Sequence, residues 1–389
     1  MVLLSCLGSA YWIGKAGSTY IHQISFIPRS IAVDRQGNIY VFTGNLAASN
    51  YQIEKLNSHG QFIARWGSYG KADGQLSYQD KYKMGGTAGL VLNVQNDVFV
   101  VDEGNNRIQK FDANGNFLTK WGSYGTSDGQ FETPVGIAVD KQSNVYVADT
   151  GNSRVQKFDA NGNFLTKWGH EGGNDGEFEG PTNLAVDKEN NVYVVDSRNF
   201  RIEKFDANGN FLGKWGGSDK GFEEQFGSLA PGSNTEVVPV AISIDTQDNI
   251  YLADSGMSRV VFGKEGKFER TRFSLEVPKD KIYDDNIIPI ENLAIDEQGN
   301  LYVAKGYYIP YAGGGITDFD GYNQEYYNPH VHKFDKTGGF LATYQPNVPP
   351  YKGVPLWVWL LAPLIGVTIG GIVTTIIARR RRRKNTAPS

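Results

Sequence analysis

The chain repeats itself, and this repeat constrains the fold more than any other feature. Residues 136–169 (GIAVDKQSNVYVADTGNSRVQKFDANGNFLTKWG) and 183–216 (NLAVDKENNVYVVDSRNFRIEKFDANGNFLGKWG) are close copies, 47 positions apart. The first segment of the unit recurs six times, as IAVD, LVLN, IAVD, LAVD, ISID and LAID, beginning at residues 31, 90, 137, 184, 242 and 293. A repeat of this length indicates units that stack on one another to bury a common core.

Each unit predicts four short β-strands. The segments IAVD, NVYVAD and RVQKFD are rich in β-branched and aromatic residues with two-residue alternation, and FLTKW completes the set. Asn-Gly pairs at residues 114–115, 161–162 and 208–209 fall between the third and fourth segments, where a tight hairpin requires positive φ. Four antiparallel strands repeated six times predict an all-β fold, a six-bladed β-propeller.

The patterns P-x-G-I-A-V-D, N-V-Y-V-A-D, N-x-R-V-Q-K-F-D and G-x-F-L-x-K-W-G resemble the NHL repeat. The resemblance implies a six-bladed propeller, in agreement with the unit count. We also expect Tyr20–Phe26 to add an edge strand to the last blade. The resemblance covers units near 28–67, 87–122, 133–169, 181–216, 238–273 and 289–344.

Residues 354–378 predict a transmembrane helix, because 25 residues pass without a charge. A helix of that length spans roughly 37 Å, enough to cross a bilayer core. Trp357 and Trp359 lie at one end, and residues 379–384 (RRRRRK) lie at the other. Such a basic cluster stays cytoplasmic, which places residues 1–353 outside and makes this a single-pass cell-membrane protein with its propeller at the cell surface. The opposite topology would require the arginines to cross the bilayer.

The remaining ends and linkers complete the domain plan. Gly366 and Gly370 have the small-residue spacing that favours a weak helix-mediated dimer. The start, MVLLSCLGSA, is interpreted as a truncated signal peptide. Cys6 is the single cysteine, which excludes a disulfide scaffold and a cysteine-based metal site. The predicted parts are an N-terminal segment, the propeller, a Pro-rich linker, the membrane helix and a cytoplasmic tail, at 1–18, 19–345, 346–353, 354–378 and 379–389.

The two faces of the propeller differ in their loops. Connections between strands two and three share one face with the blade-to-blade connections, and this face carries the long insertions. Variable loops on a rigid scaffold are the usual place for binding. The longest insertion, 306–329, forms either an aromatic binding surface or a flap packed on the sixth blade. Its candidate ligand-binding residues are Tyr307, Tyr308, Tyr311, Phe319, Tyr322, Tyr326 and Tyr327.

A second candidate set is an Asp-Asn-Arg pattern that recurs after the second strand. A ring of such arginines would hold an anionic ligand, whereas the alternative is an Asp–Arg pair that staples the blades. Histidines on the same face are a third set, since His170 and His330 are expected there, while His332 is expected on an outer strand. The candidate arginines are Arg107, Arg154, Arg201 and Arg259.

Enzymatic readings find little support in the sequence. Propellers that are peptide-amidating lyases use histidines on a metal, but two plausible ligands are fewer than the three that a catalytic zinc needs. Gluconolactonase-like propellers use channel carboxylates, and the available ones are all repeat positions: Asp34, Asp140, Asp187, Asp245 and Asp296. No nucleophile elbow or phosphate-binding loop is present. We therefore predict no catalytic residue, no bound metal and no cofactor.

The charge of the chain argues against nucleic acid as a partner. Its formal charge is −4, but removing the six terminal cations leaves 32 Lys and Arg against 42 Asp and Glu, a net charge of −10. Phosphate binding requires the opposite sign. The sequence favours an extracytoplasmic module that binds a protein, peptide or glycan. The alternatives are a metal-dependent lyase or lactonase and a structural or adhesion component of the cell surface.

Overall fold

The computed structural model describes residues 5–6, 9–10, 27–45, 50–77, 89–217, 239–254, 259–264, 267–273, 290–305 and 330–344. All of them belong to one compact unit, Met1–Asn347. The predicted membrane helix, the predicted edge strand at Tyr20–Phe26 and the 306–329 insertion lie outside the described residues. Among the helices of the described part, none is long and apolar enough to cross a membrane.

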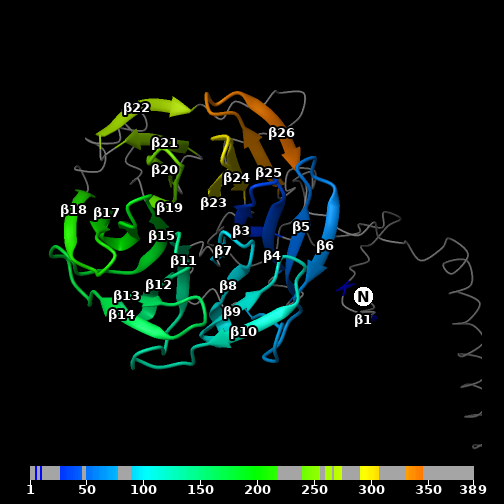
Figure 1. The fold of residues 1–389 in the computed structure, drawn as a ribbon, viewed down its shortest axis with the longest axis horizontal. Coiled ribbons are helices and arrows are strands. Elements are labelled where there is room, and N and C mark those ends of the chain that lie inside the picture. Colours follow the sequence, from blue (N-terminus) through cyan, green and yellow to red (C-terminus); the bar gives the residue numbers. More distant parts are fainter. Residues whose placement is uncertain are drawn as a thin grey trace, which may run out of the picture. The chain divides into compact units, whose positions relative to one another are not determined.

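The described strands from residue 27 onward form six four-stranded antiparallel sheets, each built from four consecutive strands (Figure 1). The first three sheets are β3 (Ile27–Val33), β4 (Ile39–Asn45), β5 (Asn50–Leu56) and β6 (Phe62–Trp66); β7 (Leu90–Leu92), β8 (Val98–Asp102), β9 (Arg107–Phe111) and β10 (Phe117–Trp121); and β11 (Pro134–Val139), β12 (Val145–Asp149), β13 (Arg154–Phe158) and β14 (Phe164–Trp168).

The other three sheets continue the same order along the chain. They are β15 (Pro181–Val186), β16 (Val192–Asp196), β17 (Arg201–Phe205) and β18 (Phe211–Gly216); β19 (Pro239–Ile244), β20 (Asn249–Asp254), β21 (Arg259–Lys264) and β22 (Lys267–Phe273); and β23 (Ile290–Ile295), β24 (Leu301–Lys305), β25 (His330–Phe334) and β26 (Phe340–Tyr344). Short strands β1 (Ser5–Cys6) and β2 (Ser9–Ala10) pair with each other.

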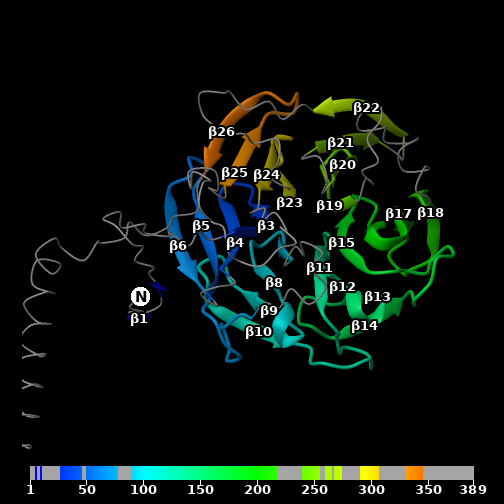
Figure 2. The same cartoon turned by 180° about the vertical axis from the view of Figure 1, so that it is seen from behind.

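The first strand of each sheet is the innermost, and it contacts the first strand of the next sheet. The ring closes where β23 contacts β3, as both face-on views show (Figures 1 and 2). An all-β propeller of four-stranded antiparallel blades is therefore confirmed. Because every described blade is continuous in sequence, the ring is closed by side-chain packing between the last blade and the first.

Burial explains why the strand sequences differ within a blade. Every residue of β12 is buried, since this strand is packed against blades on both sides. The outermost strand β14 alternates between half-buried and exposed residues, because only one of its faces meets a neighbouring blade. Apolar clusters accordingly lie between blades, and one of them joins Ile31 and Val41 of the first blade to Tyr302 and Tyr344 of the last.

Aromatic rings and hairpin glycines lock neighbouring blades together. Gly162, in the hairpin between β13 and β14, has φ +88°, and a Cβ there would lie 2.5 Å from Trp121 of the preceding blade. The same contact joins the closing blades, because Tyr344 lies against Gly60 and its hydroxyl donates to the Ser58 carbonyl at 3.3 Å. Glycine is thus required at these turns for positive φ and for close approach of the aromatic ring.

Candidate functional site

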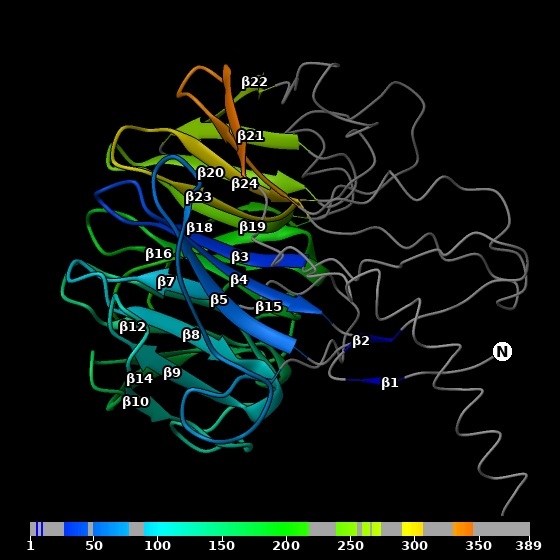
Figure 3. The same ribbon diagram turned by 90° about the vertical axis from the view of Figure 1, so that its right-hand side faces the viewer.

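The loop face of the propeller is built from two kinds of connection. Three-residue 3-10 helices join the second and third strands at η1 (Glu103–Asn105), η2 (Thr150–Asn152) and η3 (Ser197–Asn199). Blade-to-blade loops at 68–77, 123–132 and 170–179 lie beside them, since Asn152 Nδ2 donates to the Gly125 carbonyl at 3.0 Å. We use "loop face" for these six segments; Figure 3 shows the sheets edge-on with their connections on two opposite faces.

A buried Asp–Asn–Arg network holds each of these loops, and the one around Asp149 is representative. Asp149 is fully buried, and its carboxylate accepts from Arg154 Nε at 2.7 Å, from Asn152 Nδ2 at 2.9 Å and from the Glu132 amide at 2.8 Å. Burial raises the pKa of Asp149, and the hydrogen bonds from Asn152, Glu132 and Arg154 oppose this rise. The carboxylate therefore depends on these donors for its charge to be tolerated.

The remaining donors of Arg154 point to backbone. Its NH1 donates to the Thr126 carbonyl at 2.7 Å, and its NH2 donates to the Ser127 and Gln130 carbonyls, each at 2.9 Å. Arg107 and Arg201 make the equivalent contacts with loops 68–77 and 170–179. All three arginines are buried.

This geometry corrects the idea of an exposed guanidinium ring. Arg107, Arg154 and Arg201 are directed at backbone carbonyl oxygens, so they brace the loops as the stapling alternative requires. His170 is exposed on the loop face with Nε2 3.3 Å from Glu177 Oε1. The side chains of Arg259 and His330 lie outside the described residues, as do the seven aromatic candidates of the 306–329 insertion. His332 lies on β25, the third strand outward in its blade, where its side chain is fully buried with Nδ1 2.9 Å from Thr343 Oγ1.

Two exposed tyrosines on the loop face were not singled out from the sequence. Tyr69 and Tyr124 occupy matching positions in consecutive blade-to-blade loops and are 55% and 66% exposed. Each pairs through its backbone with a fully buried residue of its own loop, Leu76 or Phe131. The apolar anchor and the arginine brace hold both loops in place, so the tyrosines are presented at fixed positions. The repeated Ser-Tyr-Gly was the sequence signal for them.

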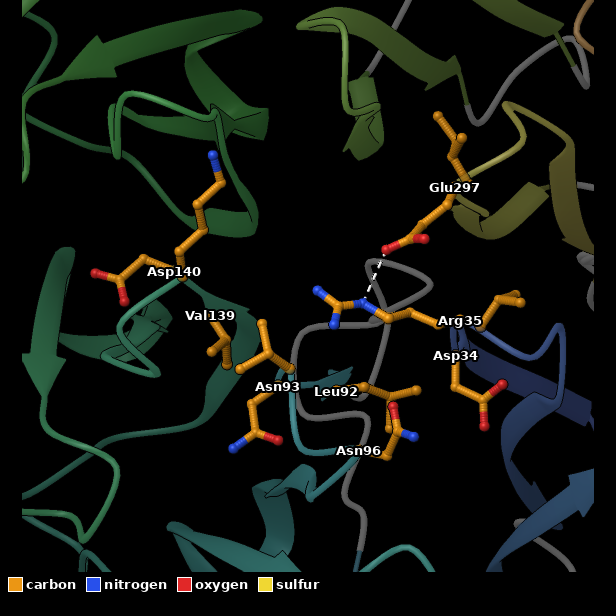
Figure 4. Close-up of a pocket in the computed structure, with 12 residues that line it drawn as sticks. Asp34, Arg35, Leu92, Asn93, Asn96, Val139, Asp140 and Glu297 are labelled. Atoms are coloured by element: carbon orange, nitrogen blue, oxygen red, sulfur yellow. Dashed lines mark hydrogen bonds and ion pairs between the residues drawn. The ribbon is translucent and has the colours of Figure 1, made fainter.

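A cavity of about 210 Å³ opens on the opposite face, at the mouth of the ring (Figure 4). The ends of β3, β7, β11 and β23 supply its apolar floor, namely Val33, Leu92, Val139 and Ile295. Arg35 extends over it to Glu297, with Nε 2.8 Å from Oε1. The sequence missed this cavity because its lining comes from turns in four different blades.

The repeated aspartates at this mouth accept hydrogen bonds from their own turns and from the tyrosine that follows. Asp140 Oδ1 accepts from the Gln142 and Asn144 amides at 2.9 and 2.8 Å, and Oδ2 accepts from Asn144 Nδ2 at 2.8 Å and from the Tyr146 hydroxyl at 3.1 Å. Asp34, Asp187, Asp245 and Asp296 make the same bonds. The described ranges contain no cluster of three or more His, Cys, Asp or Glu side chains placed to hold a metal.

Comparison with known proteins confirms the repeat. The NHL repeat model matches residues 88–111, 131–158 and 178–205, so the chain contains NHL repeats. No curated protein matches the sequence.

Three solved structures are similar to this chain. U3-55K has a TM-score of 0.52 at 13% identity, covering 80% of this chain and 95% of its own. The RRP9 WD40 repeats have a TM-score of 0.51 at 13% identity, covering 80% and 94%. Virginiamycin B lyase from Staphylococcus aureus has a TM-score of 0.48 at 14% identity, covering 84% and 86%.

Proposed function

We propose that this NHL-repeat propeller is a non-enzymatic module that binds a protein, peptide or glycan through its loop face. One observation carries the proposal: Tyr69 and Tyr124 stand exposed at matching positions on braced loops of consecutive blades. Tyrosine offers a large amphipathic contact with few rotatable bonds, so little conformational entropy is lost on binding. The tyrosine-rich sequence 306–329 connects β24 to β25, the second and third strands of the last blade, and we propose that it extends this surface.

The polar residues of the repeat are committed to the structure. The arginines of the loop face donate to backbone carbonyls, and the aspartates of the channel mouth accept from their own turns. A catalytic group must instead present a free lone pair, proton or ligand position to a substrate. The described geometry thus favours recognition by exposed aromatic side chains over chemistry at the repeat positions.

We further propose that residues 354–378 anchor the propeller in the cell membrane as a single-pass helix, with the propeller outside and the basic tail inside. The uncharged stretch and the RRRRRK sequence support this arrangement. Protease treatment of intact cells tests it. The propeller is expected to be digested before permeabilisation, and a propeller that is protected until the cells are permeabilised would contradict the topology.

Site-directed photo-crosslinking in the full chain tests the binding face. A benzophenone amino acid replaces Tyr124, and in a matched control it replaces Leu165, which is 48% exposed on the outer strand β14. We expect a discrete adduct from position 124 that weakens when Tyr69→Ser is added, and none from position 165. No adduct at 124, or the same adducts from both positions, would overturn the loop-face assignment. A stoichiometric metal in the purified chain would instead favour a lyase or lactonase.

A further inference from the structure

One buried position of the third strand differs in chemistry among three consecutive blades. Gln109, Gln156 and Glu203 occupy the same register, opposite Val100, Val147 and Val194 of the second strand. All three side chains are fully buried beneath their blade-to-blade loops. The position is therefore sensitive to the exchange of an amide for a carboxyl group, which replaces a donor by an acceptor.

The glutamine at this position joins the loop to the Asp–Arg network. Gln156 Oε1 accepts from the Gly129 amide at 2.9 Å. Its Nε2 donates to the Gln130 carbonyl at 2.7 Å and to Asp149 Oδ2 at 3.1 Å. Gln109 makes the same three bonds in the preceding blade. The oxygen of the glutamine amide thus accepts one hydrogen bond, and its NH2 group donates two.

Glu203 keeps the first of these three bonds and lacks the other two. Its Oε1 accepts from the Gly176 amide at 3.1 Å and lies 3.6 Å from Arg201 NH2. Within the described residues, its Oε2 has no hydrogen-bond partner. By the shared register, Oε2 stands where Gln156 carries its NH2 group, facing the acceptors Asp196 and the Glu177 carbonyl. An ionised Glu203 would place two buried carboxylates beside a single guanidinium.

The other charged groups around Glu203 do not supply the missing donor. Arg201 donates from Nε to Asp196 at 2.9 Å and from its other two nitrogens to loop carbonyls. Lys214, opposite Glu203 on β18, is ion-paired with Asp175. His170 is exposed and faces the Glu177 carboxylate. Burial raises the pKa of Glu203 to about 7, and the charge of Asp196 contributes to this rise.

We propose that a proton on Glu203 helps Arg201 to hold loop 170–179 to its blade, and that loss of this proton to water as the pH rises loosens the loop. The protonated carboxyl donates from Oε2 to Asp196 or to the Glu177 carbonyl, as the glutamine amide does in the sister blades. The ionised form removes that bond and sets Glu203 against Asp196. The loop that carries His170 and Glu171 on the loop face is then less tightly held.

Glu54 shows that a glutamate at this register does not by itself make the switch. It is fully buried in the first blade, opposite Val41, but Arg65 NH2 lies 2.6 Å from its Oε1. Gln52 Nε2 also donates to Glu54 at 3.0 Å. The negative charge is therefore compensated locally, and we expect no comparable pH dependence in that blade.

Hydrogen exchange of the full chain between pH 6 and 8.5, corrected for the intrinsic rate, tests this inference. In the wild type, peptides covering loop 170–179 are expected to lose protection relative to loop 123–132, on the order of tenfold at the upper pH. E203Q is expected to keep loop 170–179 protected throughout. Q156E is expected to transfer the pH dependence to loop 123–132.

Each outcome decides the proposal without reference to what the loop face binds. A wild-type loop 170–179 that is equally protected at both pH values would overturn it. So would an E203Q variant with the wild-type pH dependence, because the pH dependence would then not come from Glu203. If Q156E does not fold, the comparison of the wild type with E203Q still decides. Whether ligand capture also depends on pH rests on the proposed function, and its failure would leave the proton switch intact.

Discussion

Replacement of Gly162 by alanine tests how much of the stability comes from the contact between aromatic ring and hairpin that joins neighbouring blades. The added Cβ would lie 2.5 Å from Cδ2 and 2.6 Å from Cε3 of Trp121. The residue would also have to hold φ near +88°, which costs roughly 1–2 kcal/mol for a side chain with a Cβ. Overpacking a close contact costs about 1–3 kcal/mol. Together these give a loss of roughly 2–5 kcal/mol.

The assay is denaturant unfolding followed by circular dichroism, with a thermal melt beside it. A loss of this size corresponds to a drop in Tm of about 3–8 °C for a propeller of this length. G213A is the matched control, because Gly213 lies in the outer strand β18 with no heavy atom within 4 Å of its added Cβ. We expect that variant to stay within about 0.5 kcal/mol of the wild type or to gain slightly.

A second variant separates the two contributions. In the G162A background, W121L replaces the indole by a smaller side chain. This change relieves the overlap with the added Cβ and leaves the backbone strain at residue 162. The effects of the two substitutions on the free energy of unfolding are therefore expected to couple by about 1–3 kcal/mol. If G162A unfolds within about 1 kcal/mol of G213A, the hairpin tolerates a side chain, and the close approach of Trp121 contributes nothing to blade packing.

Three further outcomes follow from the contacts. R154M leaves Asp149 buried without its cation, so the free energy of unfolding is expected to fall by about 3–5 kcal/mol in guanidinium titrations, and a loss below about 1 kcal/mol would contradict the brace. The pKa of Glu203 rises from 4.5 to about 7 on folding; wild-type stability should therefore fall as pH rises through this window, and E203Q should exceed it above pH 7 by at most about 3 kcal/mol. E297Q breaks the exposed ion pair with Arg35, and thermal melts at low and high salt are expected to differ from the wild type by less than about 1 kcal/mol.

Much of the fold could be predicted because each strand and turn is determined by residues within a single repeat unit. The Asn-Gly hairpins, the buried second strands and the alternating outer strands follow from residue types and spacing within one unit. Ring closure could not be predicted in this way. The contact of Tyr344 with Gly60 joins residues nearly the whole propeller apart, and the last unit has tyrosine where Trp121 and Trp168 stand in the others.

The candidate site was harder to predict for a different physical reason. The spacing of Asp149, Asn152 and Arg154 is the same whether the guanidinium faces a ligand or a backbone carbonyl, so sequence alone left both open. The structure directs it at carbonyl oxygens of loop 123–132. The sequence shows that Glu203 replaces the glutamine of the two preceding blades. The effect of this replacement depends on two neighbouring hydrogen-bond acceptors, which come from β16 and loop 170–179.

The order of strands in the closing blade decides how the propeller would respond to a mechanical load. A force transmitted along the chain from beyond residue 344 enters at the end of β26, the outermost strand, whose antiparallel partner is β25. Pulling from that end breaks the hydrogen bonds between β25 and β26 one after another. Tyr344 is the first residue loaded, and its contacts with Gly60 and Ser58 also close the ring. Tension on a tethered propeller would therefore open the ring at its seam before it disturbs the middle blades.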